Sequence, residues 1–193
     1  VAYGFWPANT DKNDIIIYKN EKRINKLVRF NMLRQRKIKR GVTLSLSDFI
    51  APKDSGINDY IGAFAVTAGI NAEELSKDYE KNNDDYKAIM VKALADRLAE
   101  ALAELMHQRV RKEWGFPDKT NITNDDLIKE KYRGIRPAFG YPACPNHEEK
   151  EKLFDILKAG KIGMKLTENY SMSPAASVSG LYFANANAKY FSV

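Results

Sequence analysis

The chain has 193 residues, of which 44% are hydrophobic and 29% charged, with a formal net charge of +6. This length and mixture suit one domain that folds on its own hydrophobic core. One cysteine and two histidines exclude an intramolecular disulfide and argue against a cysteine- or histidine-based metal centre. No apolar run approaches the roughly 18 residues of a membrane helix, so we expect a cytoplasmic protein with no membrane partner.

In the first third of the chain, β-branched and aromatic runs predict strands at 14–18 and 60–67. The run at 60–67 is apolar on both faces and is therefore expected in the centre of a sheet. Alternation of apolar and polar residues predicts another strand at 42–46. Between the first two of these runs lies a basic segment whose apolar residues recur at nearly helical spacing. They predict a helix that carries Ile24, Leu27, Val28, Met32 and Leu33.

Helices are expected to dominate the middle of the chain. A short one should begin after Asn71 as its N-cap, and the longest should run over 85–112, opening at Asp84 or Asp85. A third should follow a cap at 123 and end near 132. The core-facing stripe of the longest helix is predicted to consist of Met90, Leu94, Leu98, Ala101, Leu105 and Met106.

The segment 134–145 contains three prolines and two glycines, so it is expected to be an ordered loop. A helix should follow, ending near 157, and then strands within 160–166 and 176–184. Strands and helices alternate without a βαβ rhythm. We therefore predict a single α+β domain with a mostly antiparallel, twisted sheet flanked by helices.

Four residues of the proline-rich loop are candidates for ligand binding. Arg136 offers a planar fork suited to a carboxylate or phosphate, and Gly140 permits close approach of backbone to a ligand. Ala138 leaves room for a bulky group such as a nucleoside, and Tyr141 has a rigid aromatic face and a hydroxyl. The alternative is that the loop only covers one end of the sheet.

A polar stripe on the long helix is a second candidate. Such a stripe is usually a solvated face with weak ion pairs, but its carboxylates could face a cationic ligand, and Glu130 could join them. Cys144 and His147 could form a nucleophile and base, although the prolines around the cysteine supply no positive environment. The stripe consists of Arg97, Glu100, Glu104, His107 and Arg111.

Glycine-rich phosphate loops and hydrolase elbows are absent from the sequence, which favours a binding or activating module over a self-sufficient enzyme. The segment 19–40 is strongly basic, with Glu21 as its single acid. It could bind nucleic acid, an anionic surface or an acidic protein, or be a plain solvated face. Because Phe30 is its only aromatic residue, nucleic-acid binding is disfavoured.

The run RPAFGYPACPNH at 136–147 resembles the signature of the activation domain of cobalamin-dependent methionine synthase. Further blocks, in family order, also resemble it, so the resemblance covers essentially the whole chain. It implies an activation domain at 1–193 that lacks an upstream helical segment and a C-terminal tail. These blocks lie at 4–9, 48–53, 59–66, 90–100 and 176–180.

The resemblance implies a function. In this family, cobalamin on a neighbouring domain carries methyl groups, and its cob(I)alamin form is occasionally oxidised to inactive cob(II)alamin. The activation domain binds S-adenosylmethionine and methylates the cobalamin after one electron arrives from flavodoxin or a related flavoprotein. The implied protein is a methyltransferase of methionine biosynthesis, and this domain is not expected to be catalytic alone.

The resemblance also implies residue roles. Arg136 should pair with the ligand carboxylate, the backbone of Ala138 and Gly140 should line the nucleoside, and Tyr141 should face the corrin as the catalytic contact. Acids near the site would favour a sulfonium cation. The remaining implied ligand contacts are Glu100, Glu130 and Tyr190.

Three positions depart from the family pattern. Phe191 stands where a second tyrosine is frequent, Phe139 where a proline is common, and Asn146 where an acid is common. The implied upstream segment would carry an aspartate for the ligand's ammonium group. The alternative function is a docking domain for a flavoprotein or corrinoid protein without nucleotide binding, which salt-sensitive partner binding would favour.

Overall fold

The computed structural model describes residues 1–36, 41–118 and 122–193. Its centre is a five-stranded sheet of order β3-β2-β1-β4-β7, in which every neighbouring pair is antiparallel. The predicted α+β fold is confirmed, as is the central position of the strand around 60–67, because β4 pairs on both edges. The strands are β1 (Ala2–Asp11), β2 (Asp14–Tyr18), β3 (Lys26–Asn31), β4 (Asp59–Thr67) and β7 (Ser177–Tyr182). A separate small sheet joins β5 (Lys165–Leu166) and β6 (Met172–Ser173).

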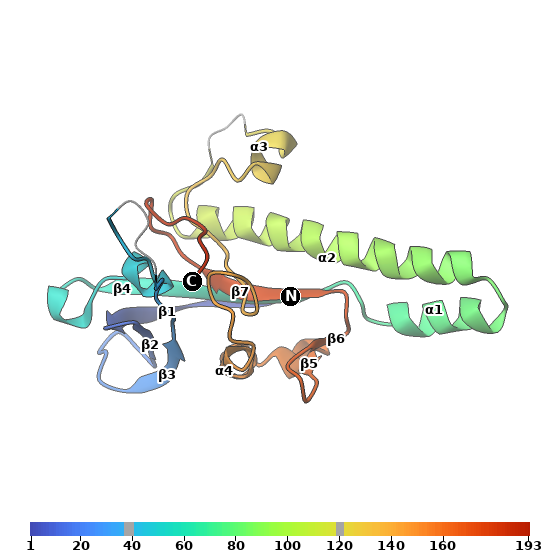
Figure 1. The fold of residues 1–193 in the computed structure, drawn as a ribbon, viewed down its shortest axis with the longest axis horizontal. Coiled ribbons are helices and arrows are strands. Elements are labelled where there is room, and N and C mark those ends of the chain that lie inside the picture. The colour runs from blue at the N-terminus through green and yellow to red at the C-terminus, as the bar shows by residue number, and fades with distance from the viewer. Residues whose placement is uncertain (37–40, 119–121) are drawn as a thin grey trace.

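Helices cover both faces of the sheet (Figure 1). One face, over β4 and β7, is covered by α2, whereas α4 packs on the other. Side chains alternate along β4, so Phe64 and Val66 pack towards α2 while Ile61 and Ala63 enter the opposite core. The helices are α1 (Ala72–Lys81), α2 (Asp85–Glu113), α3 (Asn124–Ile128) and α4 (Glu149–Leu157), with 3₁₀ turns at Leu46–Phe49, Lys53–Ser55 and Ala159–Ile162.

The helix predicted in the basic segment is wrong, because Lys26–Asn31 forms the edge strand β3. Val28 pairs with Ile17 and Phe30 with Ile15, and Phe30 is fully buried. Apolar residues at this spacing fit either a helix or a strand, and pairing with β2 decides between them. The basic residues Lys37, Lys39 and Arg40 of this prediction lie outside the described residues.

The strand predicted at 42–46 is also wrong. Residue 45 makes only an isolated bridge with Arg34, and the chain then enters the 3₁₀ turn Leu46–Phe49. The Asp48 carboxylate caps this turn by accepting the backbone N–H of Ser45 at 2.9 Å. The apolar alternation places Leu46 in the core without forming a sheet ladder. By contrast, no strand was predicted where β1 lies.

The long helix was predicted with the right ends and the wrong buried face. Asp84 caps it, accepting the backbone N–H of Lys87 at 3.1 Å. Leu94, Leu98 and Leu105 are 56%, 61% and 59% exposed, and of the predicted stripe Met106 alone is buried. Small side chains allow the helix axis to approach the sheet closely. The buried residues of α2 are Ala88, Ala95, Ala99, Ala103, Met106, His107, Val110 and Arg111.

Other boundaries differ in detail. Asn71 does occupy the N-cap position of α1, but it lies in the left-handed region and makes no side-chain capping bond. The helix capped by Thr123 is short and ends at Ile128 instead of near 132. In the described part of the chain, no helix combines the length and apolar character needed to cross a bilayer.

Candidate functional site

The proline-rich loop is attached to the free edge of β7. Ile135 and Phe183 exchange two backbone hydrogen bonds of 3.0 and 3.1 Å, and the Pro137 carbonyl accepts the N–H of Leu181 at 3.0 Å. Because Arg136 lies between these two contacts, its own N–H faces away from β7. It donates to the Tyr190 hydroxyl at 3.0 Å. The loop therefore holds Arg136 as an extended strand would.

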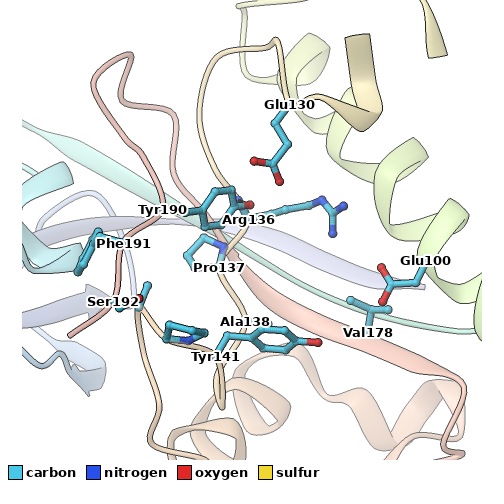
Figure 2. Close-up of a pocket in the computed structure, with 12 residues that line it drawn as sticks. Glu100, Glu130, Arg136, Pro137, Ala138, Tyr141, Val178, Tyr190, Phe191 and Ser192 are labelled. Carbon is cyan, nitrogen blue, oxygen red and sulfur yellow. Dashed lines mark hydrogen bonds between the residues drawn. The ribbon is translucent and has the colours of Figure 1, made fainter. Parts of the chain in front are cut away.

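A cavity of about 530 Å³ opens beside this loop (Figure 2). The volume lies within the roughly 300–1,000 Å³ usual for small-molecule sites. It brings together every predicted site residue except Gly140, from α2, the α3–loop connection, the loop and the C-terminal segment. The lining consists of Glu100, Glu130, Arg136, Pro137, Ala138, Tyr141, Pro142, Ala143, Val178, Tyr190, Phe191 and Ser192.

Gly140 lies outside this lining, and its predicted contact with a ligand stays a prediction. Its φ of +96° is in the left-handed region, and a Cβ there would lie 2.3 Å from Cε1 of His147. The glycine thus lets the loop turn over the imidazole ring. The group that closely approaches Gly140 in this structure is a side chain of the protein itself.

Cys144 has a structural position. Its thiol is buried and donates to the Ala138 carbonyl at 3.0 Å, and burial raises its pKa to about 12. His147 contacts Lys150, with 2.9 Å between Nδ1 and Nζ. A thiol that stays protonated at neutral pH is a poor nucleophile, so the geometry disfavours the nucleophile–base interpretation of this pair. Among the described residues, no group of three His, Cys, Asp or Glu side chains could hold a metal ion.

The electrostatics of the cavity centre on Arg136. Its Nη2 lies 3.0 Å from Oε2 of Glu104, and both side chains are largely buried, at 19% and 22% exposed. Figure 2 shows the arginine directed towards α2, with the Glu130 and Glu100 side chains beside it. Burial raises the pKa of Glu130, the Arg136 charge opposes this, and the Glu104 charge adds to it. The site combines a buried cation with acids at its edge.

The sequence missed several contributors. Val178 and Ser192 line the cavity, and the sequence predicted no ligand contact for either, although Val178 lies in the family block at 176–180. Glu104 was noted in the polar stripe, but nothing in the sequence paired it with Arg136, since 32 positions separate them. Phe191, which departs from the family pattern, does line the cavity.

Several charges of the basic segment are used inside the domain. Arg23 donates to the carbonyls of Ala8 and Asp59 at 3.1 and 2.8 Å. Arg29 pairs with Asp11 and Asp14 at 3.0 Å each. These contacts stabilise the sheet edge, so they reduce the positive charge that a docking partner would meet.

A family model described as "Vitamin B12 dependent methionine synthase, activation domain" matches residues 1–193. The chain belongs to this family. It is also similar to a solved structure, the crystal structure of the MetH reactivation domain bound to AdoHcy. That likeness has 51% sequence identity and a TM-score of 0.95, and it covers 98% of this chain. The activation-domain chain described here spans 59% of the length of that relative.

Proposed function

We propose that this activation domain binds S-adenosylmethionine in the cavity beside Arg136. The observation that carries the proposal is a buried guanidinium, fixed on the edge of β7, that opens on a cavity of about 530 Å³ with acids at its rim. The similarity to a MetH reactivation domain bound to AdoHcy supports it. AdoHcy differs from S-adenosylmethionine only by the transferred methyl group and its charge.

Each lining residue has a physical role in this proposal. Arg136 binds the carboxylate of the ligand through its planar fork. Glu100 and Glu130 provide a negative field that favours the sulfonium cation. Ala138 leaves space for the nucleoside, and Tyr190 offers an aromatic face while its hydroxyl fixes the Arg136 backbone. The bound ligand supplies an activated methyl group, and the protein orients it.

Tyr141 is proposed as the contact with the methyl acceptor. It is 64% exposed and lines the cavity, so its ring can touch both the ligand and a docked partner. The acceptor would be cobalamin carried by a neighbouring domain of a cytoplasmic methionine synthase. Reductive methylation of cob(II)alamin also needs one electron, which we assign to flavodoxin or a related flavoprotein. The domain would be catalytic only within that assembly.

Calorimetric titration with S-adenosylmethionine tests the binding step. We expect saturable binding by the wild-type chain and a loss of at least about tenfold in Arg136→Ala, since removing the cation leaves the ligand carboxylate unpaired. Arg109→Ala is the matched control, because that arginine is 60% exposed on α2 and should leave binding unchanged. Equal saturable binding by wild type and Arg136→Ala would contradict the role given to Arg136, whereas no binding by the wild-type chain would favour a docking role.

A further inference from the structure

A cluster of buried polar groups lies behind the cavity. Seven buried side-chain atoms of the described residues have no hydrogen-bond partner, and six of them belong to this cluster. Unpartnered buried polar atoms are rare in native proteins, so their concentration at one place requires an explanation. The six residues are Glu104, His107, Arg111, Tyr132, Arg136 and Tyr182.

Glu104 reaches the cavity only through Arg136. Arg136 lines the cavity, whereas Glu104 is not among the lining residues. Oε2 of Glu104 accepts from Nη2 of Arg136 at 3.0 Å, while Oε1 of Glu104 and Nε of Arg136 are buried without partners. The pair therefore uses one guanidinium nitrogen and not the two-nitrogen fork of a bidentate ion pair. Part of the guanidinium stays available to another acceptor.

Aromatic rings fix the wall beside this ion pair. His107 is 2% exposed, stacks on Tyr182 with 5.1 Å between centroids, and meets Tyr132 edge-on at 4.9 Å. Arg111 lies 3.9 Å from the centroid of Tyr132 and is held by Asp118 through two hydrogen bonds of 2.7 Å. His107 and Arg111 follow Glu104 on α2 at helical spacing, so this packing fixes the helix face that carries Glu104.

The charges of the cluster make Glu104 the counter-ion of Arg136. Burial, with Arg111 and Arg136 adding to it, lowers the pKa of His107 to about 2, so the imidazole is neutral. In the part of the chain that the structure describes, Arg136 makes a single ion pair, the one with Glu104. A buried cation needs such a partner to remain in place when no ligand is bound.

We infer that Glu104 is a positioning residue, which holds the Arg136 guanidinium by one nitrogen so that the other nitrogens meet the carboxylate of the bound ligand. This inference rests on the proposed function, and it goes beyond it by assigning a role to a residue outside the cavity. Without Glu104, the long arginine side chain would leave its orientation. The carboxylate end of the ligand would then lose its contact, while the nucleoside end would keep its own.

Ligand truncation tests this role. The probes are AdoHcy, which carries the amino-acid end, and 5′-methylthioadenosine, which lacks it. We expect Glu104→Ala to weaken AdoHcy at least about tenfold and to change the affinity for 5′-methylthioadenosine by less than about twofold. Glu104→Gln keeps an acceptor oxygen at the same place and should restore AdoHcy affinity to within about threefold of wild type. In an Arg136→Ala background, Glu104→Ala should have no further effect.

The contrary outcomes are distinct. If Glu104→Ala binds AdoHcy as the wild type does, the positioning role is wrong and the proposed function stands. If both probes weaken equally, Glu104 supports the whole site and the positioning role is wrong. If Glu104→Gln fails to restore AdoHcy affinity while its thermal midpoint matches that of the wild type, an acceptor oxygen at this place does not position Arg136, and the inference is overturned. If the wild-type chain binds neither probe, the proposed function fails, and the inference fails with it.

Discussion

Gly180 determines how closely the proline-rich loop can approach β7. A Cβ at this position would lie 2.6 Å from the Pro137 carbonyl oxygen and 3.1 Å from the ring of Phe64. The Pro137 oxygen belongs to the backbone and the Phe64 ring is buried, so moving either one away would cost free energy. The absence of a side chain at Gly180 therefore lets Pro137 lie against β7. This contact sets the position of the preceding residue, Arg136.

Gly180→Ala should displace the loop from β7. We expect the free energy of unfolding to fall by about 1–3 kcal/mol, as overpacking of a filled site does, and the affinity for AdoHcy to fall with it. Urea denaturation and calorimetry measure the two effects. Gly160→Ala is the matched control, because nothing lies within 4 Å of a Cβ there. Unchanged binding in Gly180→Ala would show that the loop does not depend on this contact.

The Cys144 thiol should be unreactive in the folded protein. It is buried and its pKa is raised to about 12, so almost no thiolate exists near pH 8. A chromogenic disulfide reagent should therefore label it only after denaturant unfolds the chain. Rapid stoichiometric labelling of the native protein would mean that the loop opens far more readily than its hydrogen bonds indicate.

At the scale of an element, α2 shows how packing can oppose a simple hydrophobic pattern. Four of its alanines are buried, whereas Leu94, Leu98 and Leu105 are exposed and Leu102 alone among its leucines packs against the core. Ala103 has no exposed surface and packs with Phe64 and Tyr182, so the helix lies close to β4 and β7. This close approach also brings Glu104 within reach of Arg136.

Two substitutions on α2 distinguish its faces. Leu98→Gln should change the free energy of unfolding by no more than about 0.5 kcal/mol, because the leucine is exposed. Ala103→Leu should cost about 1–3 kcal/mol, since the added methyl groups have no space against the sheet. Urea denaturation of both variants measures the difference. The opposite ranking would mean that the helix is rotated about its axis.

At the scale of the whole molecule, distant segments assemble the cavity. The C-terminal segment closes it, because the Gln35 amide donates to the Ser192 carbonyl at 2.7 Å and the Val193 N–H donates to the Pro142 carbonyl at 3.0 Å. In Figure 1 the C-terminus lies beside the middle of the sheet. Buried His107 lies between the layers, stacked on Tyr182 of β7, so the protonation state of one side chain affects the packing of the helix on the sheet.

Stability should therefore fall in mild acid. His107 has a folded-state pKa lowered to about 2, against 6.5 for the ordinary group. Between pH 6.5 and 2 the unfolded chain binds a proton at this histidine and the folded chain does not. The free energy of unfolding is therefore highest above pH 6.5 and falls as the pH falls towards 2. The slope approaches about 1.4 kcal/mol per pH unit. Urea denaturation between pH 7.5 and 5.5 measures it.

A matched pair of variants assigns this slope. His107→Gln should lower stability at neutral pH and reduce the pH dependence. His147→Gln, at the exposed second histidine, should keep the pH dependence. An equal slope in wild type and His107→Gln would show that other groups cause it.

The sequence by itself determined those features that depend on neighbouring residues. The cap at Asp84 and the strand propensity around Ile15 and Ile61 act locally, so the start of α2 and strands β2 and β4 were predicted correctly. The loop motif, which resembles its family, also contains half of the residues that line the cavity. Tertiary structure decided whatever depends on partners far along the chain. Pairing with β2 made Lys26–Asn31 a strand, the sheet selected the alanine face of α2, and the close approach of α2 to the loop joined Glu104 to Arg136. Such contacts gain their free energy only when distant segments meet, so no local pattern records them.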